Sequence, residues 1–156
     1  MRLFQKALLA LTSIGLLGVL TVAPARAAEL KAEGTEPGIS IVIQDLKRDE
    51  SNSVTLRFQL INDSGKSFHA GCKWREASNR ACEEIGGVHL IDNANKKKYL
   101  VVRDNTGKCA CSVMPQVKAG ARANLWAKFA APPANVEKIT VVVPDFQPID
   151  GVPITP

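Results

Sequence analysis

Apolar and polar residues alternate along most of this chain with the two-residue period of strands that bury one face. Four segments show this alternation: 39–43, 53–61, 121–129 and 139–143. The 3.6-residue period of a long helix does not occur in the chain beyond residue 28. The pattern therefore predicts an all-β protein.

A β-hairpin is predicted in the middle of the chain. The apolar runs 87–91 and 98–102 flank the turn-forming sequence Asp92-Asn93-Ala94-Asn95. Further turn sequences occur at 62–65 and 104–107, so short strands follow one another at regular spacing. This spacing is typical of an antiparallel β-sandwich or barrel.

Three stretches lack strand periodicity. Residues 28–37 are polar, contain Gly34 and Pro37, and are predicted to form a flexible leader. Residues 75–84 are polar and small, which predicts a loop with room for a short helical turn. Beyond Pro144, several prolines predict an irregular tail.

The N-terminus has the three-part layout of a secretory signal peptide. Arg2 and Lys6 precede an apolar run at 7–23, and small residues follow as far as Ala27. The apolar run is shorter than the ~20 residues of a spanning helix, so cleavage after Ala27 is expected rather than an uncleaved anchor. We therefore assign residues 1–27 to a signal peptide for the general secretory route. The protein is expected to be periplasmic or secreted, with no membrane span after cleavage.

Removing the signal peptide changes the charge balance. The whole chain has 20 Lys and Arg against 15 Asp and Glu, a net charge of +5. Three of the basic residues and none of the acidic ones lie in residues 1–27, which leaves 17 against 15, or +2. That balance gives no reason to propose nucleic acid or an anionic membrane as a partner. The remaining length suits one domain, residues 38–156.

Six runs of residues in the hairpin region and the C-terminal part are familiar together: 88–92, 98–104, 107–112, 131–134, 141–144 and 152–154. They resemble a recurring domain of exported bacterial proteins, and the resemblance covers residues 38–156. That family implies an immunoglobulin-like β-sandwich, similar in fold to the mycobacterial immunoprotective extracellular antigen. Its members often precede a peptidoglycan-binding domain of the outer-membrane-protein-A type, but the family implies no biochemical activity.

Four cysteines in an exported chain indicate two disulfides, and three pairings are possible. We favour Cys72 with Cys82, an addition to the common pattern of the family, and Cys109 with Cys111. A Cys-x-Cys bridge requires the intervening backbone to turn, because extended residues two apart lie about 7 Å from each other. Such a ring would be strained and easier to reduce. A thiol–disulfide exchange role for Cys109 and Cys111 is therefore left open.

The same cysteines allow a metal-site interpretation. With His69, His89 and Met114 they form a set of soft ligands that suits copper or zinc. Both histidines precede Cys109, unlike the order of a blue-copper site, and no Cys-x-x-Cys pair favours zinc. We therefore expect no metal or other cofactor, and a periplasmic copper- or zinc-handling protein stays as the alternative.

No complete catalytic constellation is recognisable in the sequence. It contains no Gly-x-Ser-x-Gly nucleophile elbow and no glycine-rich phosphate loop. The carboxylate pairs Asp49-Glu50 and Glu83-Glu84 fall in polar segments and are interpreted as solvated surface. We expect the protein not to be an enzyme.

Two features indicate an interaction surface. Lys96, Lys97 and Lys98 form the only run of charge, at the tip of the predicted hairpin. Of Trp74 and Trp126, one suits the core of a sandwich, and an exposed one would be a contact residue. Together these observations favour an exported, non-enzymatic binding or interaction module whose partner is an unidentified envelope protein or polymer.

Overall fold

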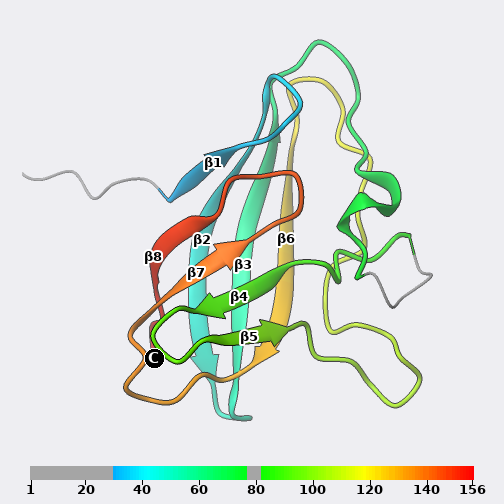
Figure 1. Cartoon of the computed structure of the whole chain (residues 1–156). Helices are drawn as coiled ribbons and strands as arrows, with labels where there is room; N and C mark the ends of the chain where they lie inside the picture. Colours follow the sequence, from blue (N-terminus) through cyan, green and yellow to red (C-terminus); the bar gives the residue numbers. More distant parts are fainter. Residues whose placement is uncertain (1–29, 77–81) are drawn as a thin grey trace, which may run out of the picture.

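The computed structural model describes residues 30–76 and 82–156 of the chain. The signal peptide predicted at residues 1–27 lies outside these described residues. Two antiparallel sheets of four strands each pack face to face (Figure 1). This arrangement confirms the all-β, immunoglobulin-like sandwich expected from the sequence. Within the described ranges, no helix is long and apolar enough to cross a membrane.

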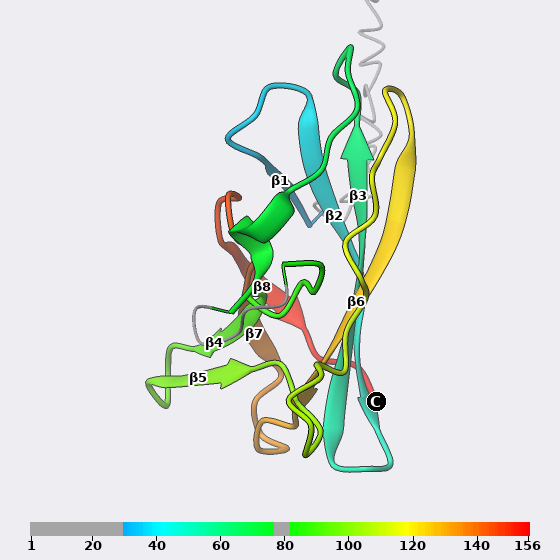
Figure 2. The same cartoon turned by 90° about the vertical axis from the view of Figure 1, so that its right-hand side faces the viewer.

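The strand order is β1-β2-β3-β6 in the first sheet and β5-β4-β7-β8 in the second. Figure 2 shows the sandwich from its side, with β3 and β6 to the right and β4, β5 and β7 to the left. The first sheet consists of β1 (Lys31–Glu33), β2 (Ile39–Asp49), β3 (Ser53–Asn62) and β6 (Arg122–Ala130). The second consists of β4 (His89–Asp92), β5 (Lys97–Leu100), β7 (Lys138–Val142) and β8 (Ile149–Pro153).

The alternating strands bury one face each in a shared core. On β3, Val54, Leu56, Phe58 and Leu60 are completely buried, because successive side chains of a strand point to opposite faces. β3 pairs with β2 on one side and with β6 on the other over most of its length. It therefore fixes which residues of both neighbours point inwards and which point to solvent.

Trp74 is the tryptophan of the core. It ends the 3₁₀ helix η1 (Gly71–Trp74), which carries its side chain between the sheets with no exposed area. Its ring centre lies 5.6 Å from that of Phe146 in an edge-to-face contact and 6.5 Å from that of Phe58. Aromatic pairs at these separations add to the stabilisation from burial. The other tryptophan, Trp126, remains exposed on β6.

A segment after β5 covers the free edge of β6. The Lys128 N–H donates to the Ala110 carbonyl at 2.9 Å, and the Ser112 N–H donates to the Trp126 carbonyl at 2.8 Å. The chain leaving the second sheet thus adds an irregular strand to the first. Because an unpaired edge strand can join other chains, this coverage leaves the side chains rather than the backbone of β6 to make contacts.

Arg48 ties the first sheet to the loop that leads into the second. Its guanidinium donates to the carbonyls of Pro132, Pro133 and Val136 at 2.7, 2.9 and 3.1 Å. These carbonyls lie in the connection from β6 to β7. The side chain therefore holds the crossover between the sheets at one end of the sandwich.

Two segments differ from the expectation. The predicted flexible leader, 28–37, contains β1, which pairs with β2 and buries Ala32. The predicted irregular tail contains β8, which pairs with β7 and buries Ile149 and Val152. β1 has only three residues, and β8 contains Gly151 and Pro153, which hide its strand pattern in the sequence. Each forms by pairing with the edge of a neighbouring strand.

Candidate functional site

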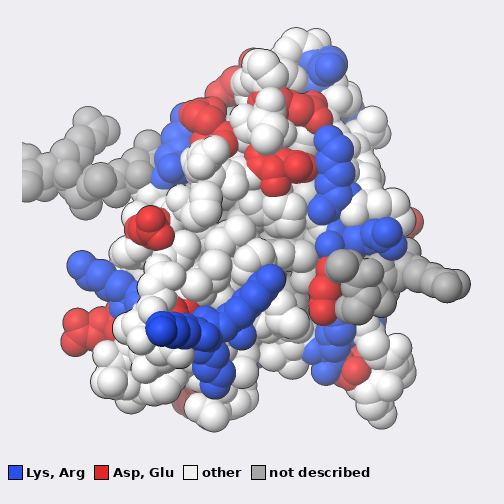
Figure 3. Space-filling view, in the orientation of Figure 1, with Lys and Arg blue, Asp and Glu red and all other residues white. Residues whose placement is uncertain are grey.

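The lysine run lies in the hairpin between β4 and β5, with Lys96 in the turn and Lys97 and Lys98 at the start of β5. Lys96, Lys97 and Lys98 are all exposed, and Figure 3 shows basic side chains gathered over this hairpin. The Lys97 ammonium lies 5.0 Å from the centre of the Tyr99 ring, a cation–π contact. None of the three lysines forms an ion pair with a described acidic residue. The hairpin therefore exposes three basic side chains, of which Lys97 lies opposite the Asp92 carboxylate.

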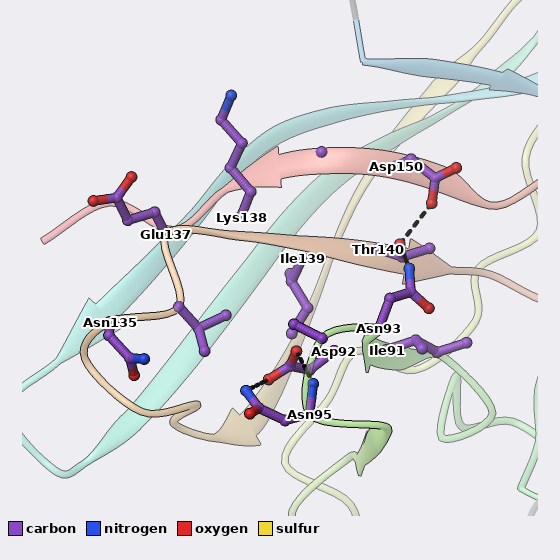
Figure 4. A pocket seen from close by; sticks show the side chains of 13 residues that line it. Ile91, Asp92, Asn93, Asn95, Asn135, Glu137, Lys138, Ile139, Thr140 and Asp150 are labelled. Carbon is purple, nitrogen blue, oxygen red and sulfur yellow. Dashed lines mark hydrogen bonds between the residues drawn. The ribbon is translucent and has the colours of Figure 1, made fainter.

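An open depression of about 500 Å³ lies beside this hairpin (Figure 4). Its walls come from the hairpin turn, the loop before β7, and strands β7 and β8. The lining side chains are mostly amides, hydroxyls and carboxylates. They include Asp92, Asn93, Asn95, Asn135, Glu137, Thr140 and Asp150.

Most polar groups at the base of the depression bond to one another. The Asp92 carboxylate accepts hydrogen bonds from the Asn95 side chain at 2.6 Å and from its backbone N–H at 3.0 Å. These bonds hold the pKa of Asp92 below its usual value. The Thr140 hydroxyl donates to Asp150 and accepts from Asn93 (Figure 4). The network therefore shapes the hairpin turn and its contact with β7.

Cys109 and Cys111 are joined by a disulfide, as expected, and their Cα atoms are 5.3 Å apart. The intervening residue turns between two backbone hydrogen bonds: the Ala110 N–H donates to Val102, and its carbonyl accepts from Lys128. Cys109 is buried and Cys111 is partly buried. The bridge therefore lies within the segment that covers the edge of β6.

Cys72 and Cys82 are also joined, which confirms the favoured pairing of all four cysteines. Cys72 belongs to η1, the same short helix that carries Trp74 into the core. The bridge closes a loop whose residues 77–81 lie outside the described ranges. It thus connects the start of that loop to the chain leading into β4.

Arg103 forms a partly buried cluster with two glutamates. Its Nε donates to Glu76 at 2.9 Å, and its Nη1 donates to Glu84 at 2.9 Å and to the Gly107 carbonyl at 2.8 Å. Burial alone would lower the pKa of Arg103, but the two carboxylates outweigh it and raise the pKa. Glu84 also accepts from the Cys109 N–H at 3.3 Å. Through Glu84, the cluster therefore holds the segment that contains the Cys109–Cys111 disulfide.

Trp126 lies on the outer side of the first sheet, and 41% of its surface is exposed. Its cross-strand neighbour on β3 is Arg57, and Asn124 faces Gln59 in the next row. Beyond the edge of β6, the Ser112 hydroxyl accepts a hydrogen bond from the Trp126 N–H at 2.9 Å. We refer to these five residues as the Trp126 face.

The polar side chains of the Trp126 face are held in fixed positions. The Asn124 side-chain oxygen accepts from Gln59 at 3.0 Å and from Gln44 at 3.3 Å. The Arg57 guanidinium donates to Asp45 at 3.2 Å. Each bond joins two strands, so the sheet itself aligns the groups. The surface offers an aromatic ring beside a row of amides and an ion pair.

The structure does not gather the residues of the metal-site interpretation. The His69 ring nitrogen accepts from the Gly71 N–H at 3.0 Å, and the His89 ring bonds the Gly87 carbonyl at 3.0 Å. Partial burial lowers the pKa of His89. Among the described residues, no three His, Cys, Asp or Glu side chains are grouped closely enough to hold a metal ion. The copper- or zinc-handling alternative gains no support from this geometry.

Sequence reasoning identified the cysteines and the lysine run but missed two groups. Arg103 meets partners 27 and 19 residues away. The interpretation of Glu83-Glu84 as solvated surface was wrong for Glu84, which lies in this cluster, whereas Glu83 is exposed. The amide row joins residues 65 and 80 positions apart. The two surfaces that the sequence did mark also lie on different sheets: the lysines on the second and Trp126 on the first.

Comparison with known proteins adds no family to these observations. Neither the known protein-family models nor the curated proteins include a match to this chain. The functional argument therefore rests on the geometry of the Trp126 face and of the lysine hairpin.

Proposed function

We propose that this chain is an exported, non-enzymatic binding module of the bacterial cell envelope, with the Trp126 face as its main contact surface. The observation that carries the proposal is the exposed indole of Trp126 on the outer side of a rigid sheet. Tryptophan buries more apolar area than any other side chain and dominates the energetics of many interfaces. An exposed tryptophan among aligned polar groups is therefore a candidate anchor for a partner.

The framework around Trp126 supports this role. The covering segment is bonded to β6 at Trp126 and at Lys128 and contains the Cys109–Cys111 disulfide. A binding surface that is already ordered loses little conformational entropy when a partner binds. The signal-peptide pattern and the resemblance to exported bacterial domains support the location in the envelope.

The lysine hairpin is a second, electrostatic contact in this proposal. Lys96, Lys97 and Lys98 lie on the second sheet, so they would act on another part of the same polymer or partner. Exposed charges accelerate association with acidic partners, and salt screens them. Their contribution should therefore weaken as ionic strength rises.

The proposal is tested by co-sedimentation with cell-envelope fragments of the producing species. The mature protein should sediment with the fragments, and Trp126→Ala should reduce the bound fraction about tenfold. Leu100→Ala is the matched control, because it removes a 46% exposed apolar side chain from the other sheet. Replacing the three lysines with glutamine should reduce binding at low salt only.

Equal sedimentation of the wild-type protein and Trp126→Ala would contradict the Trp126 face as the contact surface. Failure of the wild-type protein to sediment with any envelope fraction would contradict the binding-module proposal as a whole. Near-ultraviolet circular dichroism checks that each variant keeps its packed core around Trp74.

A further inference from the structure

We propose that the ligand of the Trp126 face is a neutral glycan, with one sugar ring stacked on the Trp126 indole and its hydroxyl groups bound by the neighbouring side chains. This inference rests on the proposed function and specifies the chemistry of its partner. It follows from three properties of the face: its exposed aromatic ring, its hydrogen-bonding groups and its charge balance.

The first property is a flat, accessible aromatic ring. Trp126 stands in the regular part of β6, between Arg57 on β3 and Ser112 in the covering segment. The Trp126 backbone N–H is bonded to the Ser112 hydroxyl, and its carbonyl accepts from the Ser112 N–H. A pyranose ring with equatorial hydroxyls has an apolar face of C–H groups, and this face stacks on an indole. An open sheet face also accommodates an extended polymer better than a closed pocket does.

The second property is a row of amide groups beside the ring. Asn124 uses its side-chain oxygen to accept from Gln59 and Gln44. Its side-chain nitrogen, and the side-chain oxygens of both glutamines, have no hydrogen-bond partner among the described residues. Amides provide both donors and acceptors, which is what the hydroxyl and acetamido groups of a glycan require. Residues two apart on β6 are spaced by about 7 Å, the scale of one sugar unit.

The third property is compensated charge next to the ring. Arg57 pairs with Asp45 at 3.2 Å, and Lys128 pairs with Asp49 at 3.0 Å. Lys47 lies further along the same face, beside Thr55. The charged residues next to Trp126, Arg57 and Lys128, thus come as ion pairs. Lys47 and Arg122, further along the face, and the three lysines of the hairpin have no ion pair among the described residues. An acidic polymer would favour the hairpin, so the Trp126 face is suited to an uncharged ligand.

The experiment titrates the mature protein with cellohexaose and with the hexasaccharide of N-acetylglucosamine, following tryptophan fluorescence. Trp74 is buried in the core, so a blue shift on binding reports the exposed Trp126. We expect saturable binding of at least one of the two neutral probes. The same titration by calorimetry extends the measurement to variants that lack Trp126.

Trp126→Ala should weaken binding of the neutral probe about tenfold or more, and Trp126→Phe should restore part of it because a smaller ring still stacks. Asn124→Ala should weaken binding by a smaller factor. Leu100→Ala should bind as the wild type does. Hexagalacturonate is an acidic probe of similar length, and its binding should weaken as the salt concentration rises. Replacing the three hairpin lysines with glutamine should remove this salt dependence, whereas Trp126→Ala should not.

Two outcomes would overturn the inference. In the first, the protein binds neither neutral probe but still sediments with envelope fragments, and Trp126→Ala still reduces that sedimentation. The proposed function then stands, with a different ligand. The other outcome is tight binding of the neutral probe that Trp126→Ala leaves unchanged. Loss of both sedimentation and glycan binding would instead remove the proposed function itself.

Discussion

Asn62 is the most heavily bonded buried polar side chain of the sandwich. It is completely buried at the end of β3. Its side-chain nitrogen donates to the carbonyls of Lys66, Val117 and Lys118 at 2.9–3.1 Å. Its oxygen accepts from the backbone N–H and the hydroxyl of Ser64. One side chain therefore closes the turn after β3 and fixes the loop that leads into β6.

Replacing Asn62 with alanine should destabilise the protein by about 2–4 kcal/mol, because a completely buried side chain loses all its hydrogen bonds at once and leaves a cavity. Urea denaturation followed by circular dichroism measures the change. Asn124→Ala is the control, since that amide is exposed and its loss should cost little. If the Asn62 variant loses no more free energy of unfolding than the control does, the hydrogen bonds of Asn62 do not stabilise the fold as predicted.

Asp49 is stabilised as a carboxylate by the turn between β2 and β3. The Ser51 and Ser53 hydroxyls each donate to it at 2.6 Å, and the Lys128 ammonium lies 3.0 Å away. The hydrogen bond from Ser51 is the largest influence, followed by those from Ser53 and Lys128, and together they hold the pKa of Asp49 far below its usual value. The folded state therefore binds this proton more weakly than the unfolded state does.

This difference predicts how stability depends on pH. The contribution of Asp49 is complete above the unfolded pKa of about 4 and is lost as the pH falls from there towards the folded pKa. Between pH 5 and pH 2, Asp49→Asn should lose less free energy of unfolding than the wild type does. Glu50→Gln, at an exposed neighbour, should keep the wild-type slope. Identical slopes for all three proteins would contradict the prediction.

At the scale of elements, the two disulfides stabilise the protein in different ways. Cys72 and Cys82 are 10 residues apart in sequence, and Cys109 and Cys111 are two apart. In the chain-entropy account, a bridge stabilises the fold by restricting the unfolded chain, and a longer loop is restricted more. The short bridge instead keeps Ala110 between its two hydrogen bonds at the edge of β6.

Replacing each pair with serine tests this division. The Cys72→Ser, Cys82→Ser protein should lose about 3 kcal/mol of stability, and the Cys109→Ser, Cys111→Ser protein about 1.5 kcal/mol. The second variant should nevertheless bind the partner of the Trp126 face more weakly, because the segment beside Trp126 loosens. Chemical denaturation and the sedimentation assay measure the two effects. The opposite ranking in both assays would refute the assignment.

At the scale of the whole molecule, export and disulfide formation belong together. The signal peptide predicted at residues 1–27 would deliver an unfolded chain to an oxidising compartment, where the four cysteines pair. A chain folded in the reducing cytoplasm would keep its thiols free. The mass of the mature protein therefore reports the compartment and the state of the cysteines at the same time.

The intact mass of the exported protein should correspond to a chain that begins at Ala28, lacks four hydrogens and binds no metal. Mass spectrometry under native and denaturing conditions, with and without alkylation, measures all three properties. Free thiols together with a bound metal would instead support the copper- or zinc-handling alternative. Retention of residues 1–27 would contradict signal cleavage.

The sequence alone determined the fold class, and it favoured the pairing of the cysteines that the structure then decided. Alternation with period two is a local property, and it survives in the folded strands because each buries one face. The turn sequences are also a local property, and they predicted the hairpin that carries Lys96, Lys97 and Lys98. Each of these predictions depended on residues close together in the chain.

The tertiary structure alone decided which tryptophan was buried and what surrounded the other. Trp74 enters the core through a short helix without periodicity, whereas Trp126 has the regular outward position of a strand residue. The neighbours of Trp126 come from β3 and from the covering segment, and those of Arg103 from residues 76 and 84. Contacts between distant segments depend on how the sheets pair and pack, and no local pattern encodes that.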